Sequence, residues 1–163
     1  MDLLAAQVGS LLKAHGLMLA TAESCTGGGV AQAITEVAGS SVWFERGFIT
    51  YSNLAKQQML GVSEAPLKQH GAVSEAVVRE MVAGALKNSV AQVALAVSGI
   101  AGPDGGTTDK PVGTVWFAWG VKDGVTFAQR HQLGGNRAEV RAQAVHIALQ
   151  GVVNLLNKRT EIA

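Results

Sequence analysis

Apolar residues recur every three or four positions in two long segments, one at each end of the chain. Residues 2–15 place Leu4, Val8 and Leu11 on one helical face, which predicts an amphipathic helix. Residues 138–156 repeat this spacing over a longer stretch, and an Asn followed three positions later by a Glu stands at its start, the pattern of a capping box. We therefore expect a long final helix.

Between these two segments, runs of strand length alternate with runs of helical spacing. The expected strands are residues 17–22, 44–51, 93–97, 112–119 and 125–133, and an Asp-Gly pair between the last two predicts an antiparallel hairpin. The expected helices are residues 27–37, residues 53–60 behind the cap Ser52, and a segment through Met81 behind the cap Ser74. This order predicts an α/β fold, in which helices cover both faces of a mixed sheet.

Composition favours one domain spanning residues 1–163, with 48% apolar and 15% charged residues. A net charge of +1 gives no field of one sign for nucleic acid or an anionic membrane, and there is no apolar run of membrane-spanning length. The single cysteine, Cys25, excludes an internal disulfide and favours a reducing cytoplasm. The first residues lack the basic segment of a signal peptide, so we expect no secretion.

The first candidate site lies where strand 17–22 ends and the next helix begins, in Glu23-Ser24-Cys25-Thr26-Gly27-Gly28. Glycines allow close backbone approach to a ligand, and a helix start offers unpaired N–H donors to an anion. Three side chains of the turn are potential nucleophiles that need a base. The segment has neither a Walker A spacing nor a dinucleotide fingerprint, and a capped glycine turn without a ligand fits it equally well.

The second candidate is Tyr51 with Lys56, at the start of the helix over residues 53–60. A lysine acts as the base of a Ser-Lys pair only when its surroundings lower its pKa from about 10.4 towards neutrality. On pattern alone, a solvated lysine and a rim aromatic are the commoner interpretations.

Two further glycine clusters indicate ligand contacts. One follows the expected strand 93–97 and contains Ser98, Gly99, Gly102, Gly105 and Gly106, with Asp104 as either a ribose ligand or part of an Asx turn. The other precedes Arg137 at the start of the final helix, where a guanidinium can clamp an anion. Arg137 and Arg141 on a solvated face are the alternative. The four histidines show no metal-binding spacing, so no metal site is expected.

Taken together, these segments resemble the CinA C-terminal domain family. The resemblance covers nearly the whole chain in order, and it is carried by Ala22 to Gly28, Trp43 to Phe48, Tyr51 to Asn53 with Lys56, His70 to Ser74, Ser98 to Gly106, and Lys110 to Val115. It implies a three-layer α/β/α fold and a homodimer. It also implies hydrolysis of nicotinamide mononucleotide to nicotinate mononucleotide and ammonia, a step of pyridine nucleotide recycling that uses no metal or cofactor.

The resemblance also implies the roles of individual residues. Ser24 would be the nucleophile and Lys56 its base, with Tyr51 assisting. The expected substrate-binding residues are Glu23, Cys25, Thr26, Gly27, Gly28, Ser98, Gly99, Gly102, Gly105, Gly106 and Arg137. Two alternatives remain open: a non-catalytic module that binds or senses a pyridine nucleotide, and a thiol hydrolase in which Cys25 works with a distant histidine.

Overall fold

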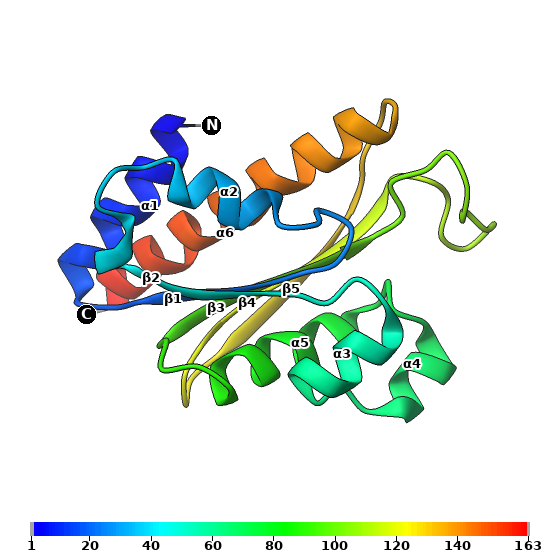
Figure 1. The fold of residues 1–163 in the computed structure, drawn as a ribbon, viewed down its shortest axis with the longest axis horizontal. Helices are drawn as coiled ribbons and strands as arrows, with labels where there is room; N and C mark the ends of the chain where they lie inside the picture. Colours follow the sequence, from blue (N-terminus) through cyan, green and yellow to red (C-terminus); the bar gives the residue numbers. More distant parts are fainter. Residues whose placement is uncertain (1, 163) are drawn as a thin grey trace.

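The computed structural model describes residues 2–162, and the surroundings of side chains for residues 3–158. Its centre is a five-stranded sheet in the order β2-β1-β3-β4-β5 (Figure 1). The strands are β1 (Leu19–Glu23), β2 (Phe44–Ile49), β3 (Val93–Gly99), β4 (Thr114–Val121) and β5 (Thr126–Gln132). β1 pairs in parallel with β2 and β3, whereas β4 runs antiparallel to β3 and β5. The predicted mixed sheet and the predicted hairpin, formed by β4 and β5, are confirmed.

Helices cover both faces of this sheet, as Figure 1 shows, with α1, α2 and α6 above it and α3, α4 and α5 below it. The upper helices are α1 (Asp2–His15), α2 (Gly29–Thr35) and α6 (Arg137–Ile162). The lower helices are α3 (Asn53–Leu60), α4 (Glu64–His70) and α5 (Glu75–Lys87). A short 3-10 helix, Ser40–Val42, precedes β2. The predicted three-layer α/β/α arrangement is confirmed.

The sheet separates two apolar cores of different character. Towards α1 and α6 the central strands present large side chains, among them Leu19, Leu95 and Phe117. Towards α5 the same strands present alanines, such as Ala20 and Ala96. Because successive side chains of a strand point to opposite faces, this alternation follows directly from the sequence. The small side chains allow α5 to lie close to the sheet.

The predicted caps hold the helices that flank the site. Ser52 Oγ accepts from the Ala55 N–H at 3.0 Å, at the start of α3. At the start of α6, Asn136 and Glu139 form the predicted capping box, with reciprocal bonds of 3.0 and 2.9 Å. The sequence analysis missed α4, which has only seven residues. Within the described residues, no helix is long and apolar enough to cross a membrane.

Candidate active site

β1 delivers Ser24 to the carboxyl end of the parallel part of the sheet. The Ser24 N–H donates to Val97 O of β3 at 3.0 Å, and the chain then turns, with the Gly27 N–H donating to Ser24 O at 3.1 Å. Gly27 and Gly28 have φ angles of +59° and +103°, in the left-handed region that side-chain-bearing residues rarely adopt. The glycines therefore permit a sharp turn immediately after a buried strand, and this turn presents Ser24.

The side chain of Lys56 reaches Ser24 from the first turns of α3. Lys56 Nζ donates to Ser24 Oγ at 2.9 Å, to Thr50 O at 2.9 Å and to Tyr51 O at 3.2 Å. Lys56 is only 1% exposed. Its hydrogen-bond partners, two carbonyls and a hydroxyl, are all uncharged. A serine and a lysine separated by 32 positions in the chain meet in a buried contact.

Burial lowers the pKa of Lys56 from 10.5 to about 8, because desolvation disfavours the charged amine. The geometry suits both protonation states. A charged amine donates one proton to each of its three partners, while the Ser24 hydroxyl donates to Tyr51 O at 3.3 Å. A neutral amine has two protons for the two carbonyls and a lone pair left to accept the Ser24 proton. The site can therefore gain or lose a proton without a large rearrangement.

Glu23 is buried behind the turn. Its carboxylate accepts from Thr26 Oγ1 at 2.6 Å, from the Val30 N–H at 2.8 Å and from the Ala31 N–H at 3.0 Å. The prediction that the start of this helix offers free donors to a ligand anion is therefore wrong for Val30 and Ala31, whose N–H groups are occupied from within the chain. Glu23 joins the turn to α2.

Cys25 is buried beside Ser24, with 6% of its surface exposed. Burial raises the pKa of its thiol to about 11. Almost none of this thiol is ionised at neutral pH, and the ionised form, the thiolate, is the one that attacks.

Ser24, Cys25 and Lys56 open onto a cavity of about 310 Å³. Of the other predicted residues, Tyr51, Ser98, Gly99, Gly102, Gly105 and Arg137 also line it, whereas Glu23, Thr26, Gly27, Gly28 and Gly106 do not. Asn53, Ala72, Val73, Ile100 and Ala101 line it as well; they lie in segments that carry the family resemblance, but the sequence analysis named none of them as a site residue. They come from the start of α3, the segment after α4 and the loop after β3, which the fold brings together at one cavity.

Arg137 closes the outer rim of the cavity. Its guanidinium donates to Gly102 O at 2.8 Å and to the hydroxyl of Tyr51 at 3.2 Å. The Tyr51 side chain is 61% exposed, so this contact lies at the mouth. The start of α6, the loop after β3 and the segment after β2 are thus joined around the opening, and Arg137 contributes a positive charge there.

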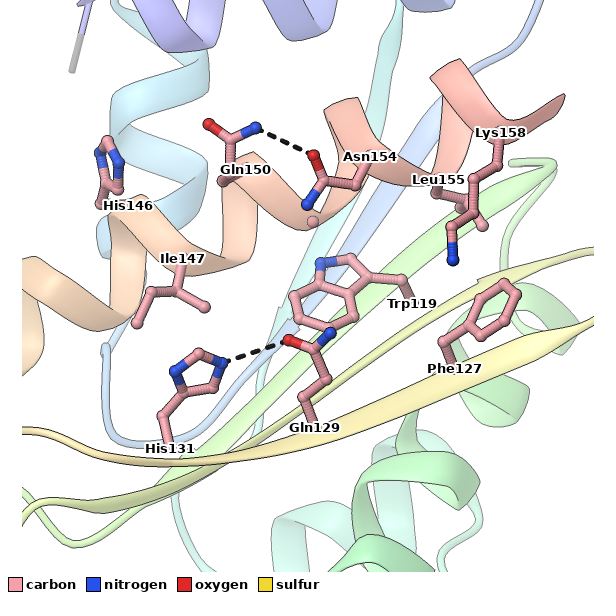
Figure 2. A pocket seen from close by; sticks show the side chains of 11 residues that line it. Trp119, Phe127, Gln129, His131, His146, Ile147, Gln150, Asn154, Leu155 and Lys158 are labelled. Carbon is pink, nitrogen blue, oxygen red and sulfur yellow. Dashed lines mark hydrogen bonds between the residues drawn. The ribbon is translucent and has the colours of Figure 1, made fainter. Parts of the chain in front are cut away.

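A second cavity, of about 220 Å³, lies between β4, β5 and α6 (Figure 2). Four of its polar side chains pair with each other, Gln150 with Asn154 at 3.1 Å and His131 with Gln129 at 3.2 Å. The residues described as lining it include no hydroxyl, thiol or carboxylate. Unlike the cavity of Ser24, it does not bring a serine hydroxyl together with a lysine amine.

The histidines do not supply a base for Cys25. His131 and His146 line the second cavity (Figure 2), and no histidine is among the described residues around the cavity of Ser24. Nor does any group of three or more His, Cys, Asp or Glu side chains that could hold a metal ion occur in the described part of the chain.

Comparisons with known proteins agree with these observations. A family model described as the CinA C-terminal domain matches residues 1–156. The nicotinamide-nucleotide amidohydrolase PncC of Escherichia coli K12 is 60% identical over 90% of this chain and 89% of that protein. The protein of the same name from Pseudomonas putida is 54% identical over 93% of this chain and 94% of its own length. The crystal structure of the competence/damage inducible protein CihA from Agrobacterium tumefaciens superposes with a TM-score of 0.92 at 44% identity, covering 96% of this chain and 94% of that chain.

Proposed function

The chain belongs to the CinA C-terminal domain family, and from this premise we propose that it hydrolyses the carboxamide of nicotinamide mononucleotide, yielding nicotinate mononucleotide and ammonia. The names of the relatives from Escherichia coli and Pseudomonas putida, 60% and 54% identical to this chain, support this substrate. The observation that carries the chemistry is the 2.9 Å contact between Lys56 Nζ and Ser24 Oγ. It joins a nucleophile to a base whose pKa lies near neutrality.

In the first half of the reaction, neutral Lys56 accepts the Ser24 proton while Ser24 Oγ attacks the carboxamide carbon. The carbonyl oxygen of the substrate becomes an oxyanion, for which backbone N–H groups of the turn are the candidate donors. Lys56 then gives its proton to the departing nitrogen. The carbon–nitrogen bond breaks, ammonia leaves, and an ester to Ser24 remains.

In the second half, a water molecule takes the place of ammonia. Lys56, neutral again, accepts a proton from the water as its oxygen attacks the ester carbon. Collapse of the second tetrahedral intermediate returns the proton to Ser24 Oγ and releases nicotinate mononucleotide. The sum is one amide and one water converted to a carboxylate and ammonium. Each proton moves through Nζ of Lys56, which is held by Thr50 O and Tyr51 O.

Arg137 is the candidate partner for the substrate phosphate. Its guanidinium lines the cavity at the opening and is bonded to neutral groups only, Gly102 O and the hydroxyl of Tyr51. An anion at the mouth would gain a charge-assisted hydrogen bond there. The nucleotide would then extend from the nucleophile to the rim, which gives Tyr51 a role in orienting Arg137.

A non-catalytic nucleotide-binding module is the second candidate, and one observation weighs against it. Burying a lysine against uncharged groups costs folding free energy, since water solvates the amine better. A binding module gains nothing from placing this amine 2.9 Å from a serine hydroxyl.

Release of ammonia from nicotinamide mononucleotide separates the two candidates. We expect the wild type to release ammonia, Ser24→Ala to lose nearly all of this activity, and Cys25→Ala to retain most of it, because the buried thiol is protonated. Cys25→Ala is a matched control, since it changes the neighbouring residue of the same turn. Binding of the mononucleotide without ammonia release by the wild type would favour the non-catalytic module. If Ser24→Ala kept its ammonia release and Cys25→Ala lost it, the nucleophile would be Cys25 instead of Ser24.

The proposal includes a homodimer working in a reducing cytoplasm, where Cys25 stays a thiol. Light scattering at micromolar protein concentration tests the first part, and a monomer mass would refute it.

A further inference from the structure

Arg141 lies one helical turn after Arg137 in α6, but it contacts a different part of the site. Its Nε donates to Cys25 O at 3.0 Å and its Nη2 to Thr26 O at 3.3 Å. The guanidinium thus spans two consecutive carbonyls of the turn that carries Ser24. A side chain at Gly27 would crowd it, since a Cβ there would lie 3.3 Å from Nη2. The turn is therefore built to receive this group.

The peptide groups of the turn are held in different ways. Ser24 O accepts from the Gly27 N–H at 3.1 Å, and Thr26 O accepts from the Gly29 N–H at 2.9 Å. Cys25 O has Arg141 as its hydrogen-bond donor, and no other donor to it occurs among the described residues. The orientation of the peptide group between Cys25 and Thr26 therefore depends on the guanidinium.

The N–H of this peptide group, which belongs to Thr26, has no hydrogen-bond acceptor in the described chain. In a planar trans peptide the C=O and N–H point in opposite directions, so holding Cys25 O against Arg141 turns the Thr26 N–H away from α6. A hydrogen bond from a cation to the carbonyl also polarises the peptide and makes its N–H a stronger donor.

We propose that Arg141 is a positioning residue, which orients the Thr26 N–H as a donor to the oxyanion formed when Ser24 attacks a carbonyl. The proposal rests on the proposed hydrolase function, and it extends the site to Thr26 and Arg141, which lie behind Ser24 and Cys25 and are not among the residues that line the cavity. Arg141 stands on a fixed support, because its neighbours Val140, Ala144 and Val145 are buried in the core. Arg137 would then bind the substrate phosphate at the rim, and Arg141 would orient the turn behind Ser24.

Because an oxyanion donor acts in the transition state, its misplacement lowers kcat rather than raising KM. We expect Arg141→Met to lower kcat for nicotinamide mononucleotide by about 10- to 100-fold, with KM close to the wild-type value. Arg141→Lys, which offers a point charge instead of a fork, should recover part of this loss. The matched control is Arg79→Met. Arg79 lies on α5 and also donates to a main-chain carbonyl, Thr126 O of β5, at 2.9 Å. It should leave kcat unchanged.

Labelling of Ser24 by a fluorophosphonate gives a second readout that does not depend on the natural substrate, since its phosphoryl oxygen occupies the oxyanion position. The labelling rate of Arg141→Met should fall by a factor similar to that of kcat. Wild-type labelling without hydrolysis of the mononucleotide would refute the proposed substrate, and the Arg141 assignment would then stand or fall on the labelling ratio. Wild-type kcat and labelling rates in Arg141→Met, or a loss confined to KM, would overturn the assignment.

Discussion

The pH dependence of hydrolysis tests the role of Lys56 most directly. Burial lowers the pKa of Lys56 to about 8, and the amine accepts the Ser24 proton only in its neutral form. With that pKa, about one tenth of the free enzyme carries a neutral Lys56 at pH 7, half at pH 8 and about nine tenths at pH 9. We therefore expect kcat/KM to rise about tenfold between pH 7 and pH 9 and to level off above pH 9.

The assay is ammonia release at low substrate concentration from pH 6.5 to 9.5. This range lies above the second ionisation of a phosphate monoester, near pH 6, so the charge of the substrate stays constant over most of it. Cys25→Ala should give the same profile, because the thiol pKa of about 11 lies outside the range. Lys56→Arg should be inactive throughout, since a guanidinium does not lose its proton in water.

Three results would refute this reasoning. A flat profile between pH 7 and pH 9 would mean that no group with a pKa near 8 controls the attack. A rising limb that persists in Lys56→Arg would assign the titration to another residue. A midpoint near 10 would show that burial does not depress the pKa of this amine.

Three further outcomes are expected. Removing the phosphate from the substrate should lower kcat/KM by about ten- to a hundredfold, and Arg137→Ala should narrow this gap by slowing hydrolysis of the mononucleotide alone; equal rates for mononucleotide and riboside would exclude a phosphate site. Glu23→Gln should lower the free energy of unfolding by about 2 kcal/mol in urea denaturation, because an amide accepts with one oxygen where the carboxylate accepts with two; an unchanged midpoint would contradict this. Gly84→Ala should destabilise the protein by about 1–3 kcal/mol in the same assay, because its Cβ would lie 1.9 Å from Leu60 O; wild-type stability would show that α5 moves aside freely.

Much of the fold was predictable because its signals are local. The capping box of Asn136 and Glu139 needs only residues three positions apart, and it forms as predicted. The hairpin turn is equally local: Asp123, beside Gly124, adopts a left-handed φ of +57° between the two antiparallel strands. The alternation of large side chains and alanines likewise fixes which face of each central strand meets which layer.

The state of Lys56 was not predictable from its neighbours. The eight residues of α3 include three polar side chains besides the lysine, which is typical of a solvated helix. Only the pairing of β1 with β2 and the seating of α3 beneath them bury this amine against Ser24. The resemblance to the family named the pair, but the distance and the lowered pKa come from tertiary contacts.

Glu23 and Arg141 show the same limit. Their positions in the sequence suggest a substrate contact for Glu23 and a solvated helix face for Arg141. In the structure Glu23 binds the start of α2, and Arg141 binds the turn. The Arg141 contact joins residues 116 positions apart, which only the packing of α6 brings together, whereas Glu23 binds residues seven and eight positions further along the chain.

The dependence of the turn on α6 has a consequence for how the chain acquires activity. The hydrogen-bond donor to Cys25 O is Arg141, which lies 116 positions further along the chain. Contacts of such long sequence separation form late, because the entropy of closing the intervening loop is lost before they contribute. During refolding, helical circular dichroism should therefore recover before ammonia release does. Enzymatic activity in this protein would then report on completion of the entire sheet and its last helix. A nascent chain that has not yet added α6 would carry Ser24, the proposed nucleophile, on a turn whose Cys25 carbonyl lacks its Arg141 donor.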